Sequence, residues 1–150
     1  MDIGNQLQKD AKTLLEKMGF QFLGLPTIEE EDGRYLLSVF VDDPKSLIGD
    51  RGANLSDFQQ IFRLIASRKY DPDIRVDIDV NGYKKKRQEL IRDMAFSARR
   101  RALVDKAPVE LEPMSSYDRR VIHATLASFP DVATASAGEG RSRRVIVSPQ

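Results

Sequence analysis

Two short motifs in this 150-residue chain carry the side chains best suited to binding chemistry. In the first, Gly49-Asp50-Arg51-Gly52, two glycines three positions apart allow backbone N–H groups to approach an anion closely. In the second, Arg119 and His123 stand four positions apart, so a helix presents both on one face. There they are suited to clamping a phosphate or stacking on a base. Both motifs predict contact with a polyanion.

The glycine motif follows the apolar pair Leu47-Ile48 and opens an amphipathic helix. In this context it resembles the nucleic-acid-binding loop of a KH domain, where the backbone approaches phosphates. In that role the loop provides a cationic contact, backbone groups that face phosphate, and a seat for a base. Arg51 is the expected cationic contact. The backbone of Gly49, Gly52 and Ala53 is expected to face phosphate, and Asn54 or Leu55 is expected to seat a base.

Asp50 argues against binding at this loop. KH loops usually carry a basic or neutral residue at the first variable position, and a carboxylate beside a phosphate costs on the order of 1 kcal/mol. The alternative interpretation is that both glycines serve only a tight turn between two helices. The sequence leaves these two alternatives open.

Charge is divided unequally along the chain, although the total is only +1. Residues 1–82 hold 10 Lys and Arg against 15 Asp and Glu, a net charge of −5. Residues 83–150 hold 14 against 8, a net charge of +6, which favours the C-terminal half for a polyanion. The basic residues there are clustered at Lys84–Arg87, Arg99–Arg101, Arg119–Arg120 and Arg141–Arg144.

Composition argues against several classes of protein. The chain has no cysteine and one histidine, so it lacks a thiol nucleophile and the usual ligands of structural zinc. No apolar run is long enough to cross a bilayer, and the first residues lack the pattern of a secretory signal. We therefore expect a cytoplasmic protein without a metal or cofactor, and without a membrane segment. An enzyme, such as a small nuclease, is a distant alternative.

The hydrophobic patterns of residues 1–82 predict the element order α-β-β-α-α-β of a KH-like domain, type II-like, in the α+β class. Asp32-Gly33 is a strong hairpin turn. The apolar stripe expected to be buried on the helix after the glycine motif is Leu55, Phe58, Ile61, Phe62 and Ile65. The expected elements are a helix over 6–18, strands over 20–28 and 34–41, a short turn of helix over 44–48, a helix over 53–67 and a strand over 73–80.

Residues 83–150 predict a small second α/β domain that begins after Asn81-Gly82. A long helix over 83–106 places Lys85, Arg92 and Arg99 seven positions apart, and so on one side. Ser115 or Ser116 is a suitable cap for the next helix. The remaining expected elements are a short extended piece at 109–111 and a hairpin of strands 132–137 and 143–147 around Gly138–Gly140.

For His123, a functional role is weighed against a structural one, since a lone histidine often serves as a hydrogen-bond partner within the fold. Val121, Ile122 and Leu126 claim the buried face of the helix, and the final hairpin brings Arg143-Arg144 close. This context favours a functional role for Arg119 and His123.

Residues 112–123, Glu-Pro-Met-Ser-Ser-Tyr-Asp-Arg-Arg-Val-Ile-His, closely resemble the core of the R-three-H domain. Glu139-Gly140 followed by residues 143–147 resembles the closing strand of that domain. A KH domain followed directly by this module is similar to the Jag, or SpoIIIJ-associated, proteins of bacteria. The resemblance covers essentially all 150 residues.

The resemblance implies a non-enzymatic RNA-binding protein linked to cell elongation, division and shape. It implies that Arg119 and His123 face single-stranded nucleic acid, and that the KH unit forms a homodimer or pairs with a small stand-alone KH protein. Two departures stand out: the family's N-terminal Jag domain and basic linker are missing, and Asp50 replaces a commonly basic residue.

The leading hypothesis is a protein that binds single-stranded RNA, or single-stranded DNA, mainly through its C-terminal half. Arg119 and His123 are the expected centre, and Lys85, Arg92 and Arg99 extend the path. The expected phosphate-tracking rim consists of Arg120, Arg141, Arg143 and Arg144. The competing hypothesis is a protein-interaction module whose acidic KH half forms a dimer and whose loop no longer binds RNA.

Overall fold

The structure is a computed structural model that describes residues 2–150. It divides into two compact units, Met1–Lys84 and Lys85–Gln150, which are called unit 1 and unit 2 below. The division falls two residues after the boundary expected from Asn81-Gly82. Each unit combines helices with one small sheet, so the predicted α+β class is confirmed.

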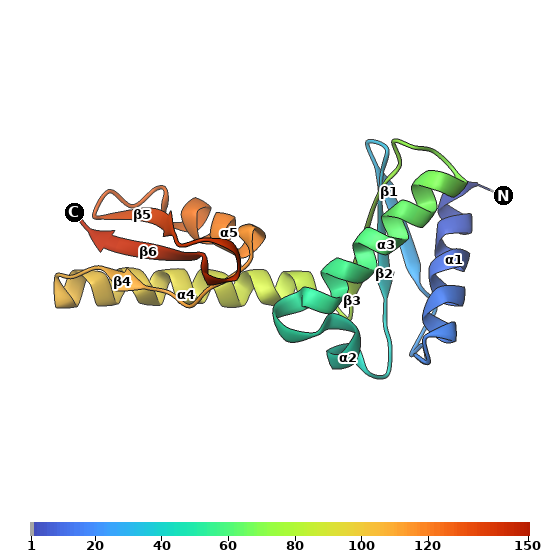
Figure 1. Ribbon diagram of the computed structural model, residues 1–150, viewed down its shortest axis with the longest axis horizontal. Coiled ribbons are helices and arrows are strands. Elements are labelled where there is room, and N and C mark those ends of the chain that lie inside the picture. Colours follow the sequence, from blue (N-terminus) through green and yellow to red (C-terminus); the bar gives the residue numbers. More distant parts are fainter. Residues whose placement is uncertain (1) are drawn as a thin grey trace. The chain divides into compact units, whose positions relative to one another are not determined.

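Unit 1 contains the predicted order of elements (Figure 1). Asp2 caps the first helix by accepting a hydrogen bond from the Asn5 amide, and Asp32-Gly33 forms the expected turn with both residues at positive φ. The elements are α1 Ile3–Lys17, β1 Thr27–Glu31, β2 Arg34–Val39, α2 Pro44–Ile48, a 3₁₀ turn η1 Asp50–Gly52, α3 Ala53–Lys69 and β3 Arg75–Val80.

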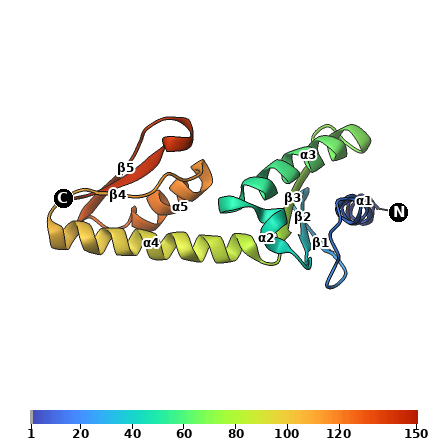
Figure 2. The same ribbon diagram turned by 60° about the horizontal axis from the view of Figure 1, so that its bottom comes forward.

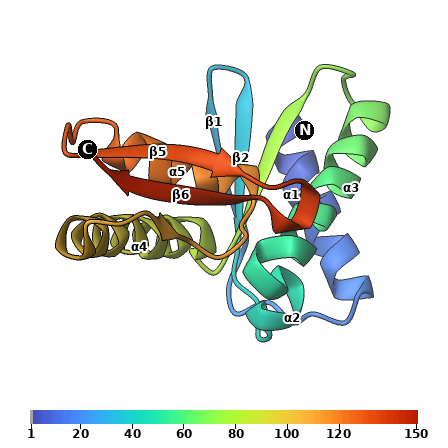
Figure 3. The same ribbon diagram turned by 60° about the vertical axis from the view of Figure 1, so that its left-hand side comes forward.

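The sheet of unit 1 has the order β1-β2-β3, with β1 and β2 antiparallel and β2 and β3 parallel. Its helices α1 and α3 lie on the same side of this sheet (Figure 3). Leu37 and Val39 of β2 pair with Ile78 and Val80 of β3, and all four side chains are fully buried. Burial of such side chains, worth about 1.5–3 kcal/mol each, joins the helices to one face of the sheet.

Two expectations for unit 1 are wrong. The strand expected over 20–28 begins only at Thr27, because Pro26 has no N–H to donate to a sheet, and Phe22 forms only an isolated bridge with Val41. Of the apolar stripe on α3, Ile61 and Ile65 are 56% and 39% exposed. The buried side of α3 consists of Leu55, Phe58, Phe62 and Ala66, so the rest of the expected stripe is confirmed.

Unit 2 contains the rest of the expected elements. Its sheet has the order β4-β6-β5 with both pairs antiparallel, and α4 and α5 lie together on one side of it (Figure 2). The elements are α4 Tyr83–Asp105, whose first two residues belong to unit 1, β4 Val109–Glu110, α5 Ser116–Leu126, β5 Val132–Ala137, a 3₁₀ turn η2 Gly140–Ser142 and β6 Arg144–Pro149.

Small residues allow α4 to approach the core of unit 2 closely. Ala95, Ala98 and Ala102 are buried along α4, where they meet Ile122 of α5 and Val145 of β6 in one hydrophobic cluster. Among residues 2–150, no helix is long and apolar enough to cross a membrane.

Candidate nucleic-acid interface

A cap and a buried ion pair fix the start of α5, the helix that carries Arg119 and His123. The Ser115 hydroxyl accepts a hydrogen bond from the Asp118 amide, as the sequence predicted for Ser115 or Ser116. The Asp118 carboxylate is buried and accepts two hydrogen bonds from Arg87 of α4, at 3.1 Å from Nε and 2.9 Å from Nη2. This pair sets the position of α5 against α4, and the sequence analysis missed it.

Arg119 and Arg143 meet through the backbone of Met114. The Arg119 guanidinium donates a hydrogen bond of 2.7 Å to the Met114 carbonyl oxygen, while the Met114 amide donates one to the Arg143 carbonyl oxygen. Arg143 in turn donates through Nη1 to the Gly138 carbonyl oxygen at 2.8 Å. The segments that carry these two arginines, which are distant in sequence, are therefore held together, as expected from the final hairpin.

His123 lies against β5, one helical turn beyond Arg119. Its Nδ1 is 2.7 Å from the Thr134 hydroxyl and its Nε2 is 3.0 Å from the Ser136 hydroxyl. These two residues are on the same face of β5 because side chains alternate along a strand. Partial burial, and then the nearby Arg119 charge, lower the pKa of His123 below its usual value. The lowered pKa favours the neutral imidazole, in which one ring nitrogen donates and the other accepts.

We call Arg119, His123 and Arg143 the basic cluster. Each comes from a different part of unit 2: the first turns of α5, the middle of α5 facing β5, and the residue before β6. The cluster combines two permanent cations with a polar imidazole held in a fixed orientation. Such an arrangement suits phosphate oxygens and the edges of unstacked bases.

The other three arginines of the expected rim have different surroundings. Arg120 and Arg141 are exposed, on α5 and in η2 respectively. Arg144 forms an ion pair with Glu110 of β4, with Nη2 3.1 Å from Oε1. Its charge is therefore partly compensated within the unit, which makes it the weakest of the four rim cations.

Lys85, Arg92 and Arg99 were expected to extend the row of cations for nucleic acid, but Arg99 has another role. Arg99 forms an ion pair with Asp131, and its guanidinium lies 4.2 Å from the centre of the Phe129 ring. This side chain fastens α4 to the segment before β5. Lys85 and Arg92 are exposed on α4.

The glycine loop of unit 1 has a backbone that glycine alone tolerates well. Gly49 adopts φ +73° and ψ −177°, a region essentially restricted to glycine, and Gly52 has φ +81°. A Cβ at Gly49 would lie 2.5 Å from Cγ of Asn54. Arg51, with φ +52°, is in the left-handed region despite its side chain. Asp50 and Arg51 are both exposed, so the loop presents one negative and one positive charge.

The structure contradicts the suggestion that Leu55 seats a base, because this side chain is 4% exposed and belongs to the core. Asn54 has a different task. Its Nδ2 donates a hydrogen bond of 3.0 Å to the Ser46 carbonyl oxygen, which ties the start of α3 to α2 across the loop. Leu55 is thus not available for a base, and the Asn54 amide already uses one donor within the loop.

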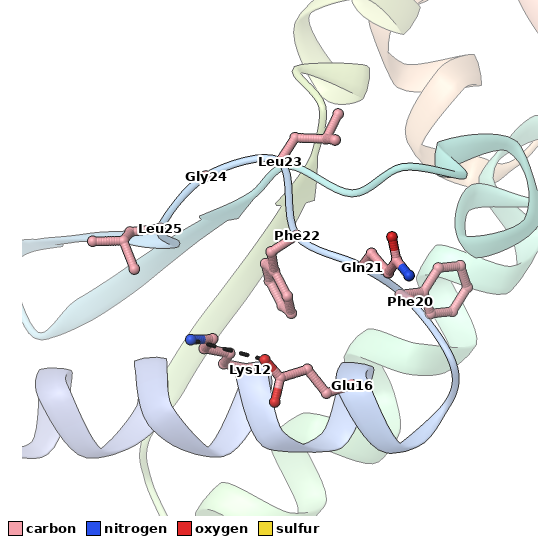
Figure 4. A pocket seen from close by; sticks show the side chains of 8 residues that line it. All are labelled: Lys12, Glu16, Phe20, Gln21, Phe22, Leu23, Gly24 and Leu25. Atoms are coloured by element: carbon pink, nitrogen blue, oxygen red, sulfur yellow. Dashed lines mark ion pairs between the residues drawn. The ribbon is translucent and has the colours of Figure 1, made fainter.

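A shallow hollow beside α1 offers no converging polar groups. Lys12 and Glu16 are its two charged residues, and they pair with each other at 3.8 Å (Figure 4). Phe22 turns toward α1, while Leu23 and Leu25 point away and are 70% and 78% exposed. Among residues 2–150 there is also no group of three or more His, Asp or Glu able to hold a metal ion.

Comparison with known proteins supports the resemblance seen in the motifs. Residues 89–149 match the R-three-H domain, so the match contains Arg119, His123 and the whole β5–β6 hairpin. The chain is 37% identical over 107 residues to the RNA-binding protein KhpB of Clostridium symbiosum, covering 71% of this chain and 48% of that protein.

Two further relatives match a larger part of the chain. The RNA-binding protein KhpB of Bacillus subtilis (strain 168) is 27% identical over 144 residues, covering 93% of this chain and 69% of that protein. That of Streptococcus pneumoniae (strain D39) is 23% identical over 150 residues, covering 99% and 44%. The chain spans about half the length of the first of these curated relatives. The R-three-H domain and these relatives confirm the resemblance to the Jag family.

Proposed function

We propose that this protein binds single-stranded RNA through the basic cluster of unit 2. Arg119 and Arg143 contact phosphates, and His123 positions an unstacked base. The exposed Arg120 and Arg141 continue the phosphate path on either side, while Arg144 contributes less because of Glu110.

One observation carries this proposal: hydrogen bonds hold together the two separate segments of unit 2 that carry Arg119 and Arg143. The Arg119 guanidinium bonds the Met114 carbonyl oxygen, the Met114 amide bonds the Arg143 carbonyl oxygen, and the Arg143 guanidinium bonds the Gly138 carbonyl oxygen. The Arg119 charge is near enough to His123 to lower its pKa. The net charge of +6 in residues 83–150 attracts the same ligand over a longer range. The relatives named RNA-binding protein KhpB support RNA as the polyanion.

The test is binding of a labelled 12-nucleotide single-stranded RNA, followed by fluorescence anisotropy over a series of salt concentrations. Affinity is expected to fall steeply with salt, because every neutralised phosphate releases counterions. The double variant Arg119→Ala/His123→Ala is expected to lose about 1–3 kcal/mol of binding free energy.

Arg100→Ala is the matched control, because Arg100 is exposed on α4 and its loss removes the same charge away from the cluster. Far-ultraviolet circular dichroism establishes that each variant remains folded. Salt-insensitive binding, or a double variant that binds as tightly as the control, would refute the proposal. A DNA strand of the same sequence distinguishes the two nucleic acids.

We also propose that the two units are separate domains, the first KH-like, and that unit 1 associates with a second KH domain in a homodimer or a heterodimer. The exposed apolar side chains Ile61, Leu64 and Ile65 on α3 support this proposal, since a solvent-facing helix normally places polar groups there. Light scattering after size exclusion measures the mass of the wild type against an Ile61→Ser/Leu64→Ser variant. A monomeric mass for both would contradict the homodimer.

We make three further proposals. The first is that the protein is not an enzyme, the second that it acts in the cytoplasm, and the third that it is connected with cell elongation and division. They follow from the family resemblance and from the lack of a thiol nucleophile in the sequence. Incubation of RNA with the protein and Mg²⁺ is expected to leave the RNA intact, and cleavage would contradict the first of them.

A further inference from the structure

A groove between α4 and α5 is lined by both aromatic side chains and arginines. None of the three residues of the basic cluster lines it. It contains two exposed aromatic side chains, Phe96 and Tyr117, with exposed fractions of 38% and 49%. The groove is lined by Gln88, Arg92, Phe96, Tyr117, Arg120, Val121, Ala124 and Thr125.

This groove is distinct from the basic cluster. On a helix with 3.6 residues per turn, Tyr117 and Ala124 lie on nearly the opposite side of α5 from Arg119. Ile122 and Leu126 fill the core between these two sides. Arg120 is the residue next to Arg119 in sequence and lines the groove, so it connects the two surfaces.

The groove's chemistry fits one occupant. Its charged lining residues are Arg92 and Arg120, and within residues 2–150 neither forms an ion pair with a carboxylate. Apolar rings beside uncompensated guanidinium groups match a base with its phosphate, because the base stacks while the arginine attracts the negative charge. The Gln88 amide adds a donor and an acceptor for a base edge.

We infer that the α4–α5 groove is a second nucleotide site, in which Tyr117 stacks on an unpaired base and Arg92 and Arg120 hold the adjoining phosphates. This inference rests on the proposed function and extends it, since a strand bound at the basic cluster continues past Arg120 into the groove. The single strand then contacts two sides of α5.

Two substitutions at one position test the stacking. Tyr117→Leu keeps an apolar side chain but removes the ring, and is expected to weaken binding of the 12-nucleotide RNA about 5- to 150-fold. Tyr117→Phe keeps the ring and is expected to bind within about twofold of the wild type, since stacking uses the face of the ring. Val104→Ala, an exposed apolar position on α4, is the matched control.

The outcomes separate this inference from the proposed function. If the wild type binds RNA and the Arg119→Ala/His123→Ala variant is weakened while Tyr117→Leu is not, the groove is not a nucleotide site and the cluster alone binds. If Tyr117→Phe loses as much as Tyr117→Leu, stacking is excluded. A wild type that does not bind RNA defeats both proposals. Thermal unfolding of Tyr117→Leu close to that of the wild type rules out loss of folding as the cause.

Crosslinking provides an independent measurement. An RNA containing 4-thiouridine is irradiated with the protein, which is then digested with trypsin. The expected sites are Tyr117, in the peptide 107–119, and Phe96, in the peptide 93–99. Fragmentation of the peptides in the mass spectrometer distinguishes Tyr117 from Arg119, which lies in the same peptide. Crosslinks confined to Arg119, His123 and residues 132–143 would overturn the inference. Retained RNA binding combined with groove residues crosslinking to a copurified protein would do the same, and would identify the groove as a protein-docking site.

Discussion

The glycine loop of unit 1 and the basic cluster of unit 2 differ in which part of the chain could attract a phosphate, the backbone in the loop and the side chains in the cluster. In the loop, the backbone conformation of Gly49 and Gly52 is specialised, but the exposed side chains Asp50 and Arg51 cancel in charge. In the cluster Arg119 and His123 lie on a regular helix and Arg143 directly precedes a strand, and side chains provide the cations. The comparison shows that a motif's geometry is kept by its glycines, whereas its attraction for a polyanion depends on its neighbours.

The largest expected effect concerns the ion pair that holds α5 in place. Arg87→Ala leaves the Asp118 carboxylate buried without its partner, which is expected to lower the free energy of unfolding of unit 2 by about 3–5 kcal/mol. Chemical denaturation measures this loss, with Arg100→Ala on the exposed side of α4 as the control. RNA binding through the cluster is lost together with the fold of unit 2.

A second variant separates charge from packing at this site. Arg87→Met/Asp118→Leu removes both charges and is expected to recover most of the stability, because apolar groups of similar size often replace a buried ion pair at little cost. If Arg87→Ala unfolds at the same denaturant concentration as the control, the pair does not hold α5.

A smaller effect is expected in the glycine loop. Asp50→Lys changes one exposed charge from negative to positive and is expected to raise affinity for single-stranded RNA about 5- to 30-fold at low salt. The gain is expected to disappear at high salt, because the loop is exposed. Fluorescence anisotropy measures the change.

Asp73→Lys is the matched control, since it makes the same change of charge at an exposed position before β3. An equal gain in both variants would indicate general attraction rather than binding at the loop. No gain in either would favour the protein-interaction role of unit 1.

The smallest effect is a dependence of stability on pH in unit 2. Burial and Arg119 lower the pKa of His123 in the folded protein, so the unfolded chain binds a proton first as the pH falls. Stability is therefore constant above about pH 6.5, the unperturbed value for histidine, and falls below it. Thermal unfolding between pH 7.5 and 5.5 measures this change.

His123→Gln is the control, because it removes the chain's one histidine and keeps groups that can bond both hydroxyls. This variant is expected to show a flat profile over the same range. A wild type with an equally flat profile would show that His123 titrates alike in both states.

Local patterns in the sequence predicted most elements of the fold. The strand over 132–137 has the expected bounds, and Ser115 caps α5 as expected. Both features depend on neighbours within a few residues. The strand follows from the alternation of its side chains, and the cap follows from a serine three residues before the amide that it accepts from. The expected stripe on α3 was right for Leu55, Phe58 and Phe62 and wrong for Ile61 and Ile65, because helical spacing does not fix how wide the buried face is. Ile61 and Ile65 share that spacing with the buried Phe58 and Phe62.

The contacts that the sequence did not reveal join distant residues. Arg87 and Asp118 are 31 positions apart, and His123 meets Thr134 and Ser136 only after the final hairpin folds. Asp118 has the sequence pattern of an ordinary acidic residue in the first turn of a helix. Its neighbour Tyr117 is 49% exposed beside the groove, a position that depends on how α4 and α5 pack.

The left-handed conformation of Arg51 has a consequence for mutational tolerance. Glycine and asparagine adopt this backbone more readily than arginine, which is strained there by about 1 kcal/mol or more. A library of all substitutions at position 51, selected for cellular abundance, is therefore expected to enrich glycine and asparagine over the native residue. Selected for nucleic-acid capture by a loop that carries Asp50→Lys, the same library is expected to retain arginine. Position 51 is thus a residue at which folding and electrostatics select different amino acids.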